Sequence, residues 1–527
     1  MAGVRGRFGV VIGVLAVVAS ACSSSGSSGG APTTTKASET STTAAPTRTA
    51  HYDDTAKRWP TPTFVEGPCP MPLDDVEVQV TCGTVQVPEN RLDPKSKTIE
   101  LAVARLHSRS ATPKADPVVQ LEGGPGFPSL VDVAGYAKSK ILDERDYIIW
   151  DQRGTGSSTP NLDCTETNDA IWGIFATTDS SEVEGKRIED SLERCRDRLR
   201  ADGVDLSGYD TTQNAADLAD LRVALGIDEW NLRGVSYGSA LAIETVRNHP
   251  EGVRSVLLDS VVPPDGPFGG VDRGKSGLRA YRELYAACAA QPSCEEKYGD
   301  LEQLFREAAA KLDAEPYRNT VVNPATGKPS PVAITGQDLW AGLFNALYDE
   351  TLIPALPGVA QAIVDGNAGV IDQVAKSGIP FVADQVEGMT ASVDCADRER
   401  ILDPKVVAPF LEAHPEMGAL VRLSVPETGC ERWGVDPQPT AFNTLLRSDV
   451  DVPILMMEGR FDPITPPAGT ERVAKALGVP VLRFPNAGHG AVSSSDCARD
   501  IYLAFLDDPK AEPDTACIDD LGPPTFG

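Results

Sequence analysis

The sequence predicts an α/β fold: a mainly parallel sheet with helices on both faces, interrupted by a large helical insertion. Short apolar runs bounded by Gly, Pro or Asp alternate with helix-length segments, which is the pattern of strands buried on both faces. A Gly-x-Ser-x-Gly motif lies between one such run and the next helix. At 527 residues the chain exceeds one ordinary domain, so a large core with insertions, or two domains, is expected.

The composition limits the classes of partner. The chain carries 76 Asp and Glu against 48 Lys and Arg, a formal charge of −28. Nucleic acid is therefore not expected as a partner, because affinity for phosphates comes mainly from Lys and Arg. With 41% apolar and 24% charged residues, most of the chain is expected to fold.

The N-terminus predicts export. Arg5 and Arg7 precede the apolar run 8–21, which is too short to span a membrane, so residues 1–21 are predicted to be a signal peptide. The run ends in Ala-Ser-Ala-Cys, which resembles a bacterial lipobox except that Leu usually stands at the position of Ala19. Cys22 is thus the candidate for lipidation, which would anchor the protein to the membrane. The alternative is an ordinary cleavage after Ala21 that leaves Cys22 as a free thiol.

Residues 22–60 form a predicted tether rich in Ser, Thr, Ala, Gly and Pro. A flexible coil of this length spans roughly 35 Å. It would hold a globular body clear of a membrane surface.

The ten cysteines after Cys22 predict disulfides rather than a metal site. Their number is even, the chain is predicted to be exported, and neither Cys-x-x-Cys nor zinc-type spacing occurs. Sequence alone leaves the connectivity open. In chain order the cysteines form neighbouring pairs: Cys69/Cys82, Cys164/Cys195, Cys288/Cys294, Cys395/Cys430 and Cys497/Cys517.

The predicted core elements follow from apolar periodicity. Helices are expected at 214–225 and 239–248, the second ending before Pro250. The predicted strands are Thr98–Leu106, Val118–Leu121, Tyr147–Trp150, Trp230–Leu232, Val253–Leu258, Val452–Met457 and Val481–Phe484.

One long segment interrupts the α/β rhythm. Residues 263–448 are mostly helix-like, with two cysteine pairs and no convincing series of strands. They predict a helical cap inserted between a first core part, residues 61–262, and a second, residues 449–527. Such a cap could cover the carboxyl ends of the strands, where α/β sheets bind ligands.

Ser236 is the predicted nucleophile. Gly234-Val235-Ser236-Tyr237-Gly238 follows a strand and opens a helix, the context of a nucleophile elbow. The glycines suit a turn so tight that side chains two residues either side of Ser236 would meet neighbouring backbone. The motif alone also arises by chance, so its position between strand and helix carries the prediction.

A serine hydroxyl needs a base that is oriented by a carboxylate. Of five histidines, only His489 follows the last predicted core strand, between two glycines, although a plain surface loop is the alternative. Asp462 follows the preceding strand and fits the chain order Ser, Asp, His of this fold. Asp259 is the rival acid, with a structural role as its more ordinary interpretation.

The oxyanion of an acyl transfer needs hydrogen-bond donors. The backbone N–H of Tyr237 is one candidate, and the glycine loop after Leu121 supplies another, with Gly124 preferred over Gly123. Asp151–Ser158 also contains glycines, but it lacks G-x-G-x-x-G and a Walker lysine. Buried structural pairs of Asp151 and Arg153 are the favoured explanation for that loop.

Six motifs in order resemble one family. They are CGTVQVP at 82–88, GGPG at 123–126, DQRGTGSS at 151–158, GVSYG at 234–238, GRFDPITP at 459–466 and AGHG at 487–490. From Cys69 onward the chain resembles the exported tripeptidyl aminopeptidases of actinobacteria, which belong to the prolyl iminopeptidase group of α/β-hydrolase serine peptidases. The resemblance implies a triad of Ser236, Asp462 and His489 under a helical cap, with no metal or other cofactor. Glu122 departs from it, because many prolyl iminopeptidases have His before GGPG.

Three functions follow as hypotheses. The favoured one is a cell-surface serine aminopeptidase acting on peptides with a free N-terminus. A carboxylic-ester hydrolase with the same triad and a non-catalytic surface lipoprotein are the alternatives. An aminopeptidase pocket should present carboxylates to the substrate's ammonium group. The sequence leaves the oligomeric state open.

Overall fold

The computed structural model describes residues 59–264, 270–323, 326–378, 386–397, 404–422, 429–437 and 451–526. The predicted signal peptide, Cys22 and the tether up to residue 58 lie outside the described residues. Parts of the predicted cap, including all of 438–448, lie outside them as well.

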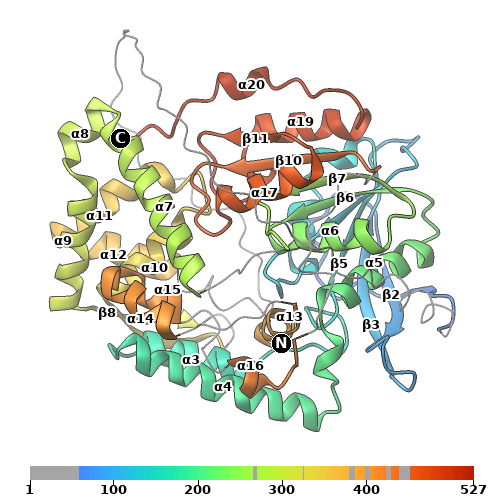
Figure 1. Cartoon of the computed structure of the whole chain (residues 1–527), viewed down its shortest axis with the longest axis horizontal. Helices are drawn as coiled ribbons and strands as arrows, with labels where there is room; N and C mark the ends of the chain where they lie inside the picture. Colours follow the sequence, from blue (N-terminus) through green and yellow to red (C-terminus); the bar gives the residue numbers. More distant parts are fainter. Residues whose placement is uncertain are drawn as a thin grey trace, which may run out of the picture.

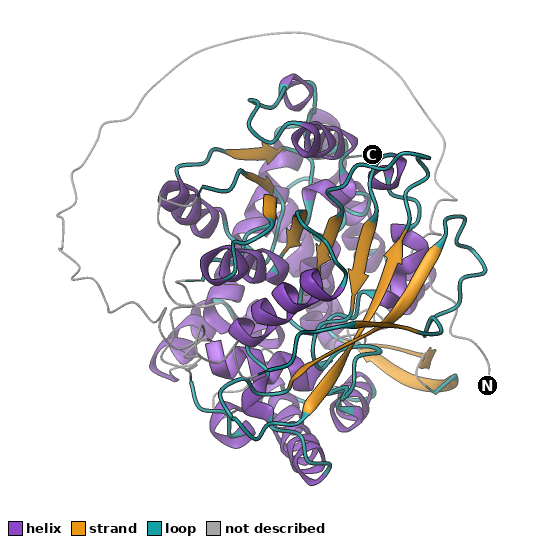
Figure 2. Cartoon of the chain, turned by 90° about the vertical axis from the view of Figure 1, so that its right-hand side faces the viewer, coloured by secondary structure: helices purple, strands orange, loops and turns teal. Residues whose placement is uncertain are grey.

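A nine-stranded sheet forms the core and confirms the predicted α/β architecture (Figures 1 and 2). Its strand order is β1-β2-β3-β5-β4-β6-β7-β10-β11; neighbouring strands are parallel from β5 to β11 and antiparallel from β1 to β5. Four predicted strands match β3, β4, β5 and β11 residue for residue. The strands are β1 (Phe64–Glu66), β2 (Val80–Pro88), β3 (Thr98–Leu106), β4 (Val118–Leu121), β5 (Tyr147–Trp150), β6 (Trp230–Val235), β7 (Val253–Asp259), β10 (Ile454–Gly459) and β11 (Val481–Phe484).

The register of the parallel strands brings their carboxyl ends together. Val235 of β6 aligns with Asp259 of β7, which in turn aligns with Met457 of β10. On the other side of β6, Leu121 of β4 aligns with Gly234. The loops that follow these strands therefore leave the sheet at one edge.

Helices cover both faces of the sheet. Alternate residues of β3 enter two different cores, because side chains of a strand alternate between faces. Leu101 and Val103 pack with α5 (Thr211–Ala224), α6 (Tyr237–Asn248) and α17 (Pro467–Leu477). Ala102 and Ala104 pack with α2 (Val133–Tyr136) and α19 (Asp496–Asp507). Two short helices, α18 (Ala491–Ser494) and α20 (Ala516–Asp519), lie on either side of α19 in the chain.

The segment between β7 and β10 lies beside the sheet and is mainly helical (Figure 1). We call it the cap. Its helices have a separate apolar core that includes Tyr281, Phe305, Trp340 and Phe344. The helices are α7 (Gly270–Ala289), α8 (Pro292–Tyr298), α9 (Leu301–Ala314), α10 (Gly336–Ala346), α11 (Leu356–Val364), α12 (Ala368–Gly378), α13 (Glu387–Asp397), α14 (Pro404–Ala413), α15 (Gly418–Arg422) and α16 (Gly429–Trp433).

A β-hairpin in the cap was not predicted from the sequence. It pairs β8 (Tyr317–Asn323) with β9 (Lys328–Ile334). Pro329 and Pro331 lie in β9, and proline lacks the N–H that a strand normally donates. The two prolines are the reason why this run was not predicted as a strand. Both strands of a two-stranded hairpin are edge strands, so the hairpin tolerates the missing donors.

Two segments from outside the 263–448 insertion pack against it. The helices α3 (Thr165–Phe175) and α4 (Ser181–Ala201) form a hairpin, in which α3 contacts β9 and α4 contacts α13, α15 and α16. The C-terminal tail reaches the cap core, because Phe526 is buried there and the Gln291 side chain donates to the carbonyl of Pro524 over 2.7 Å.

Five disulfides connect the described cysteines, and they confirm the neighbour pairing. Two of them lie within the cap. The pairs are Cys69–Cys82, Cys164–Cys195, Cys288–Cys294, Cys395–Cys430 and Cys497–Cys517.

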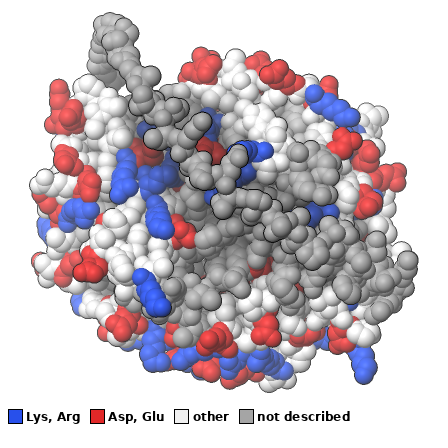
Figure 3. Space-filling model, viewed as in Figure 1, with Lys and Arg blue, Asp and Glu red and all other residues white. Residues whose placement is uncertain are grey.

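The described surface mixes charges of both signs. On the described part of the face in Figure 3, Lys and Arg side chains lie among Asp and Glu side chains rather than in one continuous basic area. Of the helices in the described ranges, none combines the length and apolar character needed to cross a membrane.

Candidate active site

Ser236 occupies a tight turn between β6 and α6. Its φ is +58° and its ψ −127°, a conformation that residues other than glycine rarely adopt, and it is 9% exposed. A Cβ at Gly238 would lie 1.9 Å from the carbonyl oxygen of Leu121, and a Cβ at Gly234 would lie 2.5 Å from the oxygen of Gly238. The turn therefore requires glycine at both positions, as the sequence predicted.

Asp259 joins the Ser236 turn to the loop that contains His489. Its carbonyl accepts a hydrogen bond of 3.0 Å from the Ser236 N–H. Its carboxylate accepts from the N–H groups of Ala491 and Val492, over 3.1 and 2.8 Å. Burial raises the pKa of this carboxyl. Asp259 thus bridges two backbone segments, which agrees with a structural role rather than that of the acid.

His489 and Asp462 are in direct contact. Nδ1 of His489 lies 2.8 Å from Oδ2 of Asp462, whose side chain is fully buried. Oδ1 accepts from the N–H groups of Ile464 and Thr465, both over 2.9 Å, and the Thr465 hydroxyl donates to Oδ2. Burial opposes the charge of Asp462, but the imidazole and these hydrogen bonds outweigh it and hold the pKa of Asp462 below its usual value.

Electrostatics favour the protonated form of the His489 imidazole. Burial lowers its pKa, but the charge and hydrogen bond of Asp462 raise it further, and Asp259 and Glu122 add to the increase. The net pKa of His489 lies above its usual value. The described residues include no hydrogen bond between Ser236 Oγ and His489.

The glycine loop after β4 lies against Ser236. A Cβ at Gly123 would lie 3.0 Å from Cβ and 3.4 Å from Oγ of Ser236, whereas a Cβ at Gly124 would meet Gly126 and Phe127. The glycine beside Ser236 is therefore Gly123. Its N–H donates to the Glu122 carboxylate over 3.2 Å.

Glu122 is the residue that departs from the family motif. Its carboxylate also accepts from the Tyr136 hydroxyl over 2.5 Å and from the Gln120 amide over 3.3 Å. These contacts place a carboxylate beside the loop that lies against Ser236.

Elements of the cap contact the glycine loop and the acid loop. The Val386 N–H donates to the carbonyl of Gly126 over 3.0 Å, and the Thr390 hydroxyl donates to that of Pro125 over 2.6 Å. Arg279 of α7 donates to the carbonyl of Arg460 over 2.9 Å and also to that of Asp462. The cap therefore contacts both loops that lie at the site.

Glu387 begins α13 directly after the contact between Val386 and Gly126. Burial, together with the charge of Asp394, raises the pKa of Glu387 to about 7, against the opposing effect of Arg273. A carboxylate in this position was not predicted from the sequence, because nothing in the local pattern links residue 387 to a loop more than 250 positions earlier. Thr465 and Tyr348, which contact Asp462 and His489, were also missed; only Thr465 carried a signal, through its place in the Asp462 motif.

The 151–158 loop is held by buried polar contacts. Arg153 is fully buried and pairs with Asp217, with 2.6 Å between Nη2 and Oδ1. The Asp151 carboxylate accepts from the N–H groups of Leu130 and Ser157, over 2.9 and 2.7 Å. This agrees with the predicted structural role, although Asp151 bonds to backbone rather than to a charged side chain.

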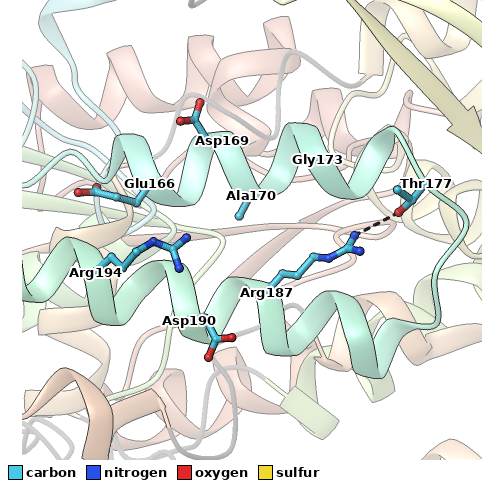
Figure 4. Close-up of a pocket in the computed structure, with 8 residues that line it drawn as sticks. All are labelled: Glu166, Asp169, Ala170, Gly173, Thr177, Arg187, Asp190 and Arg194. Atoms are coloured by element: carbon cyan, nitrogen blue, oxygen red, sulfur yellow. Dashed lines mark hydrogen bonds between the residues drawn. The ribbon is translucent and has the colours of Figure 1, made fainter.

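A groove of about 440 Å³ lies between α3 and α4 (Figure 4). Three of the charged side chains that line it are paired: Glu166 with Arg198 over 2.7 Å, Arg187 with Asp179 over 2.6 Å, and Asp190 with Lys186 and Arg432 over 3.1 and 3.0 Å. None of the predicted site residues lines this groove. Within the described ranges, no group of three or more His, Cys, Asp or Glu side chains is arranged to hold a metal ion.

The sheet order and the turn at Ser236 define an α/β hydrolase. Residues 116–327 match the family described as alpha/beta hydrolase fold, and residues 418–517 match the family described as TAP-like protein. The chain thus has the α/β-hydrolase fold and a segment that matches the TAP-like family.

Three relatives show what the chain is similar to. Serine protease Hip1 of Mycobacterium tuberculosis is 25% identical over 456 residues, covering 81% of this chain and 84% of Hip1. Carboxylesterase B of the same species is 25% identical over 466 residues, covering 81% of this chain and 84% of that protein. Tripeptidyl aminopeptidase of Streptomyces coelicolor is 30% identical over 196 residues, covering 35% of this chain and 36% of that enzyme. A protease and a carboxylesterase thus align over similar spans.

Proposed function

We propose that the protein is a serine hydrolase that acts through an acyl-enzyme. Ser236 is the nucleophile, His489 takes its proton and later returns it to the leaving group, and Asp462 orients the imidazole. The observation that carries this proposal is the 2.8 Å contact of His489 Nδ1 with buried Asp462, at the same sheet edge as the Ser236 turn. With Nδ1 donating to Asp462, Nε2 is left as the basic nitrogen.

Two backbone N–H groups are proposed to bind the oxyanion. One belongs to Tyr237, the residue after Ser236 and the first residue of α6, because the N-terminus of a helix directs its backbone N–H groups outward. The second comes from the glycine loop, and its geometry favours Gly123 over the Gly124 preferred from the sequence. Since the Gly123 N–H donates to Glu122, the oxyanion would take the place of that carboxylate.

The favoured substrate is a peptide with a free N-terminus. Support comes from the TAP-like match, from the protease and aminopeptidase relatives, and from Glu387 at the start of α13 beside the glycine loop. The pKa of Glu387 is about 7 because burial and Asp394 raise it by more than Arg273 lowers it. A substrate ammonium near Glu387 would favour the ionised carboxylate. The amine would thereby be recognised by charge.

Carboxylic-ester hydrolysis is the second candidate, favoured by the similarity to carboxylesterase B. It uses the same triad and differs in what the pocket recognises. A non-catalytic binding protein is the third candidate, and retention of all three triad residue types argues against it.

The proposed location is outside the cell, with Cys22 carrying a lipid anchor. Five disulfides support an oxidising compartment. The tether from 22 to 60 would connect the anchor to the folded body.

The deciding experiment compares peptides with free and acetylated N-termini against short acyl esters. Acetylation should lower kcat/KM by about 10- to 150-fold, because it removes a charge-assisted hydrogen bond. Glu387→Gln should reduce that preference, whereas Glu307→Gln on the exposed face of α9 should leave it unchanged. Turnover of acyl esters without cleavage of any peptide would establish the esterase instead.

A further inference from the structure

A chain of buried hydrogen bonds connects the cap to the residue after Ser236. It starts at Asp397, the last residue of α13, which is 2% exposed. The Asp397 carboxylate accepts from the Thr211 N–H over 3.1 Å and from the Thr211 hydroxyl. Thr211 Oγ1 in turn lies 2.8 Å from the hydroxyl of Tyr237.

The carboxylate sets the direction of these bonds. Both bonds from Thr211 run to the carboxylate, one from the N–H and one from the hydroxyl, which has a single proton to donate. The Thr211 hydroxyl therefore donates to Asp397 and accepts from the Tyr237 hydroxyl. The Tyr237 side chain is thus held in one orientation at the start of α6.

A second branch ends at the glycine loop. Nδ2 of Asn214 lies 2.5 Å from Oε1 of Gln152 and 3.4 Å from the Tyr237 hydroxyl. Nε2 of Gln152 donates to the carbonyl of Glu122 over 3.0 Å. That carbonyl belongs to the same planar peptide unit as the Gly123 N–H, so a bond to the carbonyl also orients the N–H.

We propose that Asp397 is a positioning residue through which the cap aligns both oxyanion donors, the N–H groups of Tyr237 and Gly123. The inference rests on the proposed function, since it concerns the same acyl transfer. It extends that function by making the cap part of the oxyanion site. The groups that lie between Asp397 and Glu122 come from α5, α6 and the 151–158 loop, so no single core element could impose this alignment alone.

The test uses variants that interrupt this chain of hydrogen bonds and leave the proposed triad intact. Thr211→Val and Tyr237→Phe each remove one hydroxyl, and Asp397→Asn replaces an acceptor with a group that also donates. Each should lower kcat by about 10- to 100-fold with KM within about twofold, because misaligned donors affect the transition state more than substrate binding.

Non-additivity and a matched control separate positioning from stability. The double variant Thr211→Val with Asp397→Asn should lose little more than either single variant, because both interrupt one chain. Thr245→Val is the control. Thr245 lies in α6, the helix that begins at Tyr237, and its buried hydroxyl donates to the Leu241 carbonyl over 2.8 Å. It should lower the melting temperature without lowering kcat.

Hydrogen exchange supplies a readout that does not depend on turnover. In the full-length protein, Thr211→Val and Asp397→Asn should speed amide exchange in peptides covering 122–127 and 236–239, whereas Thr245→Val should not speed exchange in 122–127. Unchanged exchange in both segments would overturn the proposal. Wild-type kcat in all three variants of the hydrogen-bond chain (Thr211→Val, Tyr237→Phe and Asp397→Asn) would overturn it as well.

The two proposals can fail separately. An active wild type that Ser236→Ala inactivates, together with unaffected chain variants, would reject only the role of Asp397. An inactive wild type would reject the proposed function, and the exchange data would then show whether the chain aligns the two segments.

Discussion

The backbone N–H of His489 donates to the main-chain carbonyl of Tyr348 over 3.0 Å, and their ring centroids lie 4.7 Å apart. Tyr348 belongs to the cap, between α10 and α11. The imidazole of the proposed base is thus held by Asp462 on one side and packed against a cap residue on another. Loss of the tyrosine ring should therefore affect the orientation of the base.

Tyr348→Ala is expected to lower kcat by about 10-fold, because the imidazole gains freedom that the triad geometry does not tolerate. Tyr348→Phe keeps the ring and should retain near-normal kcat. Steady-state kinetics of the two variants, with circular dichroism to check folding, makes the comparison. Equal activity of the Ala and Phe variants would show that the ring contact has no catalytic effect.

Ser236→Ala is expected to abolish hydrolysis and leave the protein folded. Loss of a triad member typically costs on the order of 10⁴–10⁶ in kcat. The removed hydroxyl is not needed for packing, so thermal unfolding should stay near that of the wild type. A folded variant with near-normal turnover would contradict the assignment of the triad.

The pH profile should report the state of His489. Neutral His489 is the proposed base, so kcat/KM should fall as pH drops through its pKa, which lies above the usual 6.5. Glu122 contributes to that increase, so Glu122→Gln should lower the pKa of His489 and move the acid limb toward lower pH. Glu100→Gln, an exposed residue of β3, is the control that should not move it. A limb that moves toward higher pH would contradict the electrostatic role of Glu122.

Removal of the Cys395–Cys430 disulfide should destabilise the cap. The bond joins α13 to α16 across 35 residues, and closure of such a loop contributes about 4 kcal/mol in the chain-entropy estimate. The double variant Cys395→Ser with Cys430→Ser should melt at a lower temperature. In the untreated wild type, mass spectrometry should find no alkylation of either cysteine without a reductant; ready alkylation would contradict the pairing.

Cys22→Ala should release active protein from the membrane fraction. Acyl chains on Cys22 would supply the anchor, and stable anchoring takes more than one chain. Activity measured in the soluble and membrane fractions of producing cells tests this. Unchanged membrane association would place the anchor elsewhere, and a soluble wild type would mean that Cys22 is not lipidated.

Local chemistry made much of the protein predictable from sequence. The β3, β4, β5 and β11 strands follow from apolar runs bounded by turn residues, and the glycines around Ser236 follow from steric contact within one turn. His489 and Asp462 were predicted because each lies in the loop that follows a strand, and the strands of a parallel sheet end at one edge. The β10 strand starts later than predicted, after Pro453, because proline has no N–H to donate.

Only the tertiary structure decided which residues of the cap contact which residues of the core. Asp397 and Thr211 are separated by 186 residues, Tyr348 and His489 by well over 100, and Val386 reaches the glycine loop from another part of the chain again. The choice of Gly123 over Gly124 depends on which glycine approaches Ser236, and that approach depends on the packing of β4 against β6. Sequence spacing describes contacts within a turn or a helix; contacts between remote segments arise from packing, which no local pattern encodes.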